Sequence, residues 1–202
     1  MDQILKTVSD IGIIPVIAIE DAGKAVPLAR ALTAGGLPAA EVTFRTAAGE
    51  EAIRRIAQNC PEVLVGAGTV LNLDQCGRAL AAGAKFIVSP GYNEELVNYC
   101  VEKGVPVFPG CVNASDMTRA VNAGLKVVKF FPAEQSGGVA FLKALAPVLP
   151  LNFMPTGGVN TKNLLDYLSF ERIAACGGPG FCVFYTWPGP RAKGEGGVGG
   201  GG

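Results

Sequence analysis

Short runs of β-branched and aromatic residues recur along the chain, and a segment with helical spacing of apolar residues follows nearly every one. Eight runs are expected to form strands, at residues 13–19, 40–44, 63–67, 86–89, 105–108, 127–131, 152–155 and 173–176. Because the runs are almost wholly apolar, the strands should be buried on both faces, as in parallel sheets. Eight strand–helix units predict a closed (β/α)8 TIM barrel, with an open doubly wound sheet as the alternative.

The intervening segments predict helices at residues 22–34, 49–59, 73–82, 93–103, 114–122, 137–149 and 160–169, and a short one at 2–10. Four side chains are expected to cap helices: Asn72, Asn93, Ser115 and Asn160. From Gly177 onward glycine and proline dominate, and these residues do not support a closing eighth helix. We therefore expect one barrel domain at residues 1–178 and a Gly/Pro-rich, disordered tail at 179–202, with the last helix missing or disordered.

Composition narrows the classes of function. The 17 basic and 17 acidic residues balance, so charge gives no reason to expect nucleic acid or a membrane surface as a partner. Histidine is absent, which disfavours a zinc site, although carboxylates could still hold magnesium. The six cysteines are widely spaced, the N-terminus does not resemble a signal peptide, and no apolar run is long enough to span a membrane. A cytoplasmic protein with reduced thiols is expected.

Two of the apolar runs carry charged residues. Alternation places Glu41, Thr43 and Arg45 on one face, and Lys129 lies between two apolar residues on each side. Burial favours the neutral amine, which is the nucleophilic form, and a nearby Arg45 would add to this effect. With Glu41 to move protons, these residues indicate imine chemistry on a keto acid. A structural Glu41–Arg45 pair and a lysine that reaches out to solvent are the alternatives.

Glycine-containing stretches follow three other runs. Residues 66–70, GAGTV, let a substrate approach the backbone and offer the Thr69 hydroxyl, although a plain strand-to-helix turn is the alternative. Gly157 and Gly158 precede an expected helix, where N–H groups and a helix N-terminus would bind phosphate. Gly177 and Gly178 would supply the second half of that site.

Five motifs occur in the order and at the spacing of the 2-keto-3-deoxy-6-phosphogluconate (KDPG) and 4-hydroxy-2-oxoglutarate (KHG) aldolase family: EVTFRT, VGAGTVLN, SPGYN, KFFPAE and PTGGV. Residues 1–178 resemble this family. The resemblance implies that Lys129 forms a Schiff base and that Glu41 transfers protons. It also implies that Arg45 contacts the substrate carboxylate and that Thr69 contacts the substrate.

Further residues of these motifs are expected in the site. Pro90, Phe131 and Thr156 would contact substrate, and the four glycines Gly157, Gly158, Gly177 and Gly178 would bind phosphate. The implied enzyme is a class I aldolase, typically a homotrimer, that needs no metal or organic cofactor. It would release pyruvate together with glyceraldehyde 3-phosphate from KDPG, or with glyoxylate from 4-hydroxy-2-oxoglutarate.

One position departs from the family pattern, in which a Ser or Thr and then a Trp usually follow the second glycine pair. This chain has Pro179 there, which offers neither a hydroxyl nor an N–H group. A weaker phosphate site is therefore expected. The missing last helix would uncover apolar surface on the first, seventh and eighth strands, so a less stable barrel is also expected. A catalytically silent barrel, an aldolase for the galactonate epimer, and an epimerase or isomerase on the same fold are the alternative functions.

Overall fold

A computed structural model describes residues 2–179. Its strands are β1 (Ile13–Ile17), β2 (Ala39–Thr43), β3 (Leu64–Gly68), β4 (Ile87–Val88), β5 (Val107–Phe108), β6 (Val127–Phe130), β7 (Asn152–Pro155) and β8 (Cys176–Gly178). Its α-helices are α1 (Asp2–Ile11), α2 (Ala25–Ala34), α3 (Gly49–Asn59), α4 (Leu73–Ala81), α5 (Glu94–Glu102), α6 (Ala114–Asn122), α7 (Gly138–Leu145) and α8 (Leu164–Leu168). Two 3-10 helices, η1 (Ala22–Lys24) and η2 (Glu134–Ser136), precede α2 and α7. The expected tail and closing helix lie outside the described residues, apart from Pro179.

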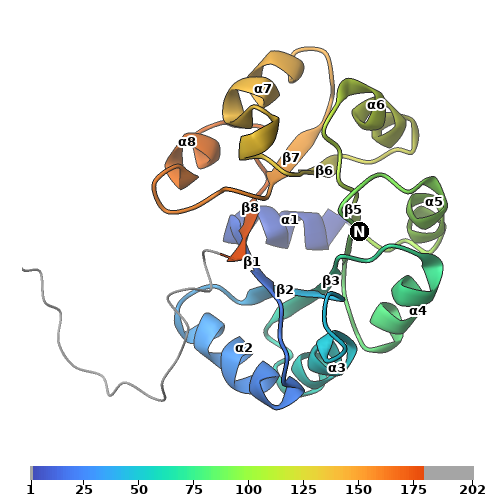
Figure 1. Ribbon diagram of the computed structural model, residues 1–202, viewed down its shortest axis with the longest axis vertical. Coiled ribbons are helices and arrows are strands. Elements are labelled where there is room, and N and C mark those ends of the chain that lie inside the picture. Colours follow the sequence, from blue (N-terminus) through green and yellow to red (C-terminus); the bar gives the residue numbers. More distant parts are fainter. Residues whose placement is uncertain (1, 180–202) are drawn as a thin grey trace, which may run out of the picture.

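The parallel strands stand side by side in chain order. Six of them form the sheet β5-β4-β3-β2-β1-β8, and β6 pairs with β7. Single bridges join the two groups, between Gly110 and Lys129 on one side and between Thr156 and Gly177 on the other. Helices α2 to α8 surround this ring (Figure 1). The predicted (β/α)8 barrel is therefore confirmed, and the doubly wound sheet is wrong.

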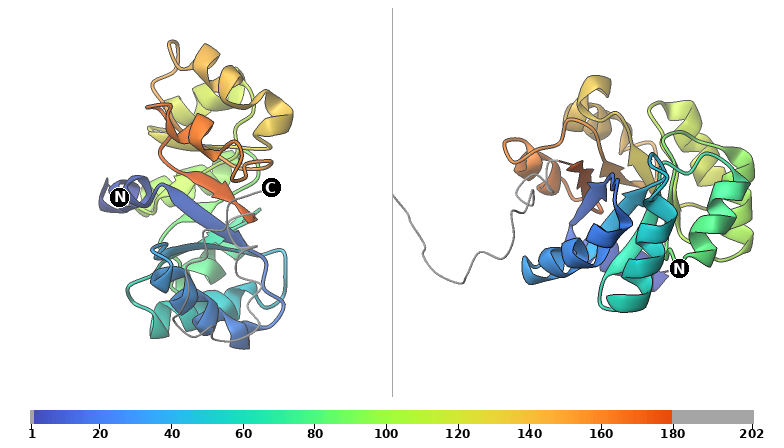
Figure 2. Two further views of the ribbon diagram at one scale, coloured as in Figure 1. Left: turned by 90° about the vertical axis from the view of Figure 1, so that its left-hand side faces the viewer. Right: turned by 60° about the horizontal axis from the view of Figure 1, so that its bottom comes forward.

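Helix α1 lies across the amino-terminal end of the barrel, where it crosses the middle of the ring (Figures 1 and 2). Its Val8 is 1% exposed and belongs to an inner apolar cluster that includes Phe86, Phe108 and Met154, all fully buried. Apolar side chains thus fill the amino-terminal end of the lumen. Because side chains two residues apart on a strand share a face, the next layer toward the carboxyl ends holds different residues of the same strands.

A second apolar cluster packs the outer faces of the strands against the surrounding helices. Asn72 and Asn93 cap α4 and α5 as predicted, because each side-chain oxygen accepts a backbone N–H of the first turn. The prediction for α6 is wrong by two residues, since Asn113 and not Ser115 is the cap. Asn160 does not cap α8, which begins only at Leu164, because Asn160 forms a turn in which its own N–H donates to Asn163 Oδ1.

The last strand differs from its prediction at 173–176. β8 runs from Cys176 to Gly178, and Ile173 makes only a single bridge to Phe153. Pairing with β1 sets this register, with Ile13 opposite Cys176 and Ile14 opposite Gly177. The second glycine pair therefore lies within the strand and not in a loop after it. β-propensity alone placed the strand too early, because glycine is a poor strand former when no partner is considered.

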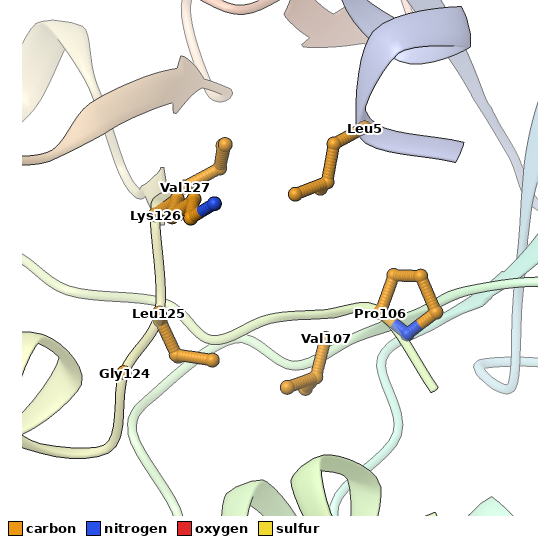
Figure 3. A pocket seen from close by; sticks show the side chains of 7 residues that line it. All are labelled: Leu5, Pro106, Val107, Gly124, Leu125, Lys126 and Val127. Carbon is orange, nitrogen blue, oxygen red and sulfur yellow. The ribbon is translucent and has the colours of Figure 1, made fainter. Parts of the chain in front are cut away.

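A small cavity lies at the amino-terminal end of the barrel, between α1 and the segments that lead into β5 and β6 (Figure 3). Its lining includes Leu5, Pro106, Val107 and Leu125, which are apolar. It is on the opposite side of the lumen from the charged residues described below. Within residues 2–179, no helix has the length and apolar character needed to cross a bilayer.

Candidate active site

Glu41 and Lys129 meet in the lumen, above the inner apolar cluster. Lys129 Nζ lies 3.3 Å from Glu41 Oε1, and the two residues are 6% and 0% exposed. Ala39 and Val127, two residues earlier on the same strands, belong to the inner cluster, so alternation brings both charged side chains to the inner face. The alternative of a lysine that reaches solvent is wrong. The Glu41 carboxylate pairs with Lys129 and not with Arg45.

Burial withdraws both side chains from bulk water, so each depends on the other as its polar partner within the lumen. Glu41 Oε2 has no hydrogen-bond partner among the described residues, which leaves one carboxylate oxygen available to a substrate or a water molecule.

Space for the Glu41 carboxylate comes from a glycine on the neighbouring strand. β2 and β3 pair with Thr43 opposite Gly68, and a Cβ atom on Gly68 would lie 2.2 Å from Glu41 Oε1. Any side chain at that position would displace the carboxylate. Gly68 was not predicted as a site residue. The small residues of the GAGT motif were the available signal, but the clash becomes visible only with the strand register.

The backbone around Lys129 is held by the segment that follows β5. Lys129 N donates to Pro109 O at 3.0 Å, and Cys111 N donates to Lys129 O at 2.8 Å. Phe131 borders the amine, since Lys129 Nζ lies 5.3 Å from the centroid of its ring. The next turn, after β4, is also close, because a Cβ atom on Gly110 would lie 2.0 Å from Pro90 O. Phe131 therefore lies beside the amine, whereas Pro90 lies against Gly110, the residue that bridges to Lys129.

Arg45 lies beyond the end of β2 and is exposed, and its Nε donates to Thr43 Oγ1 at 3.2 Å. Its expected proximity to the amine stays a prediction. Thr43 is buried and donates in turn to Ile17 O at 3.0 Å. Strand alternation fails for Arg45 because the strand ends at Thr43. Arg45 thus borders the mouth of the lumen, where its role in binding a carboxylate remains a prediction.

Thr156 is a further buried polar residue near the carboxyl ends of the strands. It is 4% exposed, follows β7, and its Oγ1 has no hydrogen-bond partner among the described residues. Gly177 on β8 leaves room for it, because a Cβ atom there would lie 2.5 Å from Thr156 Oγ1. An unpartnered buried hydroxyl is costly, which points to a ligand or water in the complete site. Thr69 is half-buried on the rim after β3, in the left-handed region with φ of 57°.

The glycine turn after β7 consists of Gly157 and Gly158, with φ values of 94° and 80° that L side chains rarely adopt. Neither N–H group donates a hydrogen bond within residues 2–179. The expected helix N-terminus at this turn is wrong, since α8 begins at Leu164. Gly177 and Gly178 are buried in β8, so their backbone is committed to the barrel wall.

The cysteine thiols near the site are buried and free. Burial raises the pKa of the Cys111 thiol from 9.0 to about 12, and burial does the same for Cys176. Both thiols are therefore protonated at neutral pH and are poor nucleophiles. Among the described residues of this layer, Lys129 is thus the side chain with the properties of a nucleophile.

Fold and site together define a class of protein: a (β/α)8 barrel that buries an amine beside a carboxylate toward the carboxyl ends of its strands, as imine chemistry requires. A family model described as KDPG and KHG aldolase matches residues 2–184. The chain belongs to this family.

Individual relatives agree with the family assignment. The 2-dehydro-3-deoxy-phosphogluconate aldolase of Treponema pallidum is 49% identical over 179 residues, which cover 88% of this chain and 85% of the relative. A crystal structure of KDPG aldolase from Legionella pneumophila has a TM-score of 0.83 and 39% identity, and the match covers 87% of this chain and 86% of that one. In that structure pyruvate is captured at low pH as a covalent carbinolamine intermediate. The KDPG aldolase of Zymomonas mobilis ZM4 with 3-phosphoglycerate has a TM-score of 0.82 and 41% identity, covering 87% and 84%.

Proposed function

We propose that this protein is a class I aldolase that cleaves KDPG into pyruvate and glyceraldehyde 3-phosphate, and 4-hydroxy-2-oxoglutarate into pyruvate and glyoxylate. The observation that carries the proposal is the buried contact of 3.3 Å between Lys129 Nζ and Glu41 Oε1. Membership in the family supports it, as does the covalent carbinolamine of the Legionella relative, because a carbinolamine forms when an amine adds to a ketone.

The first stage joins the substrate to Lys129. The neutral amine attacks carbon 2 of the keto acid, the carbonyl oxygen takes up a proton, and the amine loses one. The carbinolamine hydroxyl then leaves as water after a second proton transfer, which gives a protonated imine. Glu41 is within hydrogen-bond distance of the amine, so it can carry both protons, directly or through one water molecule.

The second stage breaks the bond between carbons 3 and 4. Glu41, or a water molecule that it holds, removes the proton of the carbon 4 hydroxyl, and the electrons of the broken bond flow into the imine. The aldehyde leaves and an enamine remains on Lys129. Carbon 3 then takes up a proton, water hydrolyses the imine, and pyruvate departs. Since these steps use only Lys129, Glu41 and water, activity should survive treatment with EDTA.

The other site residues are assigned supporting roles. Arg45 at the mouth binds the substrate carboxylate by a charge-assisted hydrogen bond. Thr69, Pro90, Phe131 and Thr156 contact the substrate chain. The glycine turn binds phosphate through its N–H groups, whereas Gly177 and Gly178 contribute less than expected because β8 includes them. Pro179 has no N–H group, so the phosphate site should be weak.

We further propose that residues 1–178 form the catalytic domain and that the enzyme acts in the cytoplasm as a homotrimer. The five cysteines of the described part are free thiols, in line with a reducing compartment. Light scattering on the purified protein tests the trimer, and a monomer at micromolar concentration would contradict it.

Turnover of matched substrates tests the proposed function. Pyruvate release is measured from KDPG, from its galactonate epimer and from 4-hydroxy-2-oxoglutarate, with wild type and with Lys129→Met. Wild type should cleave KDPG and 4-hydroxy-2-oxoglutarate, and the variant neither, while circular dichroism shows both folded. Preference for the epimer would change the substrate assignment. A folded wild type that releases no pyruvate from any of the three would favour the silent barrel.

A further inference from the structure

Tyr167 on α8 is a buried tyrosine outside the pair that performs the proposed reaction. It is 1% exposed, and its hydroxyl donates a hydrogen bond to Glu134 Oε1. Burial and this hydrogen bond raise the pKa of Tyr167 well above its ordinary value. The hydroxyl is therefore a neutral donor over the working pH range, and it holds one carboxylate oxygen in a fixed direction.

Glu134 lies directly against the glycine turn. Glu134 N donates to Gly157 O at 3.1 Å, and a Cβ atom on Gly158 would lie 2.5 Å from Glu134 Cγ. The amide groups of Asn160 and Asn163 donate to Gly158 O at 2.9 and 3.1 Å. The glycine turn is thus in contact with the stem of Glu134 and with two asparagine amides.

The position of Glu134 creates an electrostatic problem. Its carboxylate begins one bond beyond Cγ, the atom that a Cβ on Gly158 would meet, and so lies near the turn assigned to phosphate. A carboxylate turned toward that turn would repel a phosphate group. The hydrogen bond to Tyr167 turns it the other way, toward Gly138, where a Cβ atom would lie 3.2 Å from Glu134 Oε1 and 3.3 Å from the Tyr167 hydroxyl.

We propose that Tyr167 is a positioning residue for phosphate recognition, which holds the Glu134 carboxylate away from the glycine turn so that the turn can accept a phosphorylated substrate. This inference rests on the proposed function and deepens it. Tyr167 acts through Glu134 and touches neither the substrate nor the reacting atoms. It therefore affects specificity between phosphorylated and unphosphorylated keto acids and leaves the imine chemistry unchanged.

The test separates charge from packing. Tyr167→Phe keeps the ring but frees the carboxylate, so KM for KDPG should rise about tenfold, equivalent to about 1.4 kcal/mol. The kcat values and KM for 4-hydroxy-2-oxoglutarate should stay near wild type. Glu134→Gln combined with Tyr167→Phe keeps the stem and removes the charge, so it should restore KM for KDPG. Tyr99→Phe on α5 is the matched control for loss of a hydroxyl.

Three results would overturn the inference: an unchanged KM for KDPG, equal changes for both substrates, or no rescue by the double variant. Failure of the proposed function is distinguishable, because wild type would then form no adduct with pyruvate and borohydride. Binding of inorganic phosphate, followed by 31P line broadening, does not need activity. Tyr167→Phe should weaken it about tenfold relative to wild type and Tyr99→Phe, and unchanged binding would refute the positioning role.

Discussion

Gly68→Ala should separate catalysis from folding, because the added methyl group would meet the Glu41 carboxylate. A Cβ atom at this position lies 2.2 Å from Oε1 and 2.6 Å from Cγ of Glu41. Glu41 is fully buried, so the carboxylate must turn away from Lys129 or the strands must move apart. Overpacking of this kind costs about 1–3 kcal/mol of stability, while loss of a positioned acid–base group costs a rate factor of about 10² to 10⁴.

The assay is pyruvate release under substrate saturation, together with urea denaturation. Gly68→Ala should lower kcat about 100-fold while the protein remains folded. Gly77→Ala is the matched control, because a Cβ atom there meets nothing within 4 Å. It lies in α4, so it should keep full activity and gain about 0.5–1 kcal/mol of stability. A folded Gly68→Ala with kcat within about twofold of wild type would refute the reasoning.

Three further changes should have separable effects. Glu41→Gln keeps a partner for the amine but cannot carry protons, so kcat should fall by about 10² to 10⁴ with unchanged circular dichroism; near-normal kcat would contradict this. Thr156→Val removes an unpartnered buried hydroxyl, so the free energy of unfolding should rise by about 1 kcal/mol while kcat/KM falls; loss of stability would argue against an unpartnered hydroxyl. Burial raises the pKa of the Cys111 and Cys176 thiols in the folded protein from 9.0 to about 12. Each thiol therefore contributes stability that is fully present below pH 9.0 and is lost as the pH rises toward 12, by about 1.4 kcal/mol per pH unit. A urea midpoint that stays constant from pH 9 to 11 would contradict this.

The barrel and its central pair could be predicted because both follow from local patterns. Apolar runs at regular spacing define the strands. A charged residue whose two neighbours are apolar faces the lumen, because alternation directs those neighbours toward the surrounding helices. Lys129 and Glu41 satisfy that condition within their own strands. Arg45 does not, because β2 ends before it and alternation no longer fixes the direction of its side chain.

The remaining features depend on partners that a single segment does not contain. The place of β8 is set by its pairing with β1, which draws Gly177 into the strand. The start of α8 depends on competition between two asparagines for one turn, in which the Asn163 side chain accepts the N–H of Asn160. Gly68 matters only because register places it beside Glu41. Each of these outcomes follows from contacts across the fold.

The site of covalent attachment tests the central claim most directly. The purified protein is incubated with pyruvate and borohydride, digested, and mapped by mass spectrometry. A carboxyethyl group should be found on Lys129 and on no other lysine, and the unreduced control should carry none. An adduct on a surface lysine alone, or a folded protein with no adduct, would contradict the proposed imine chemistry at Lys129.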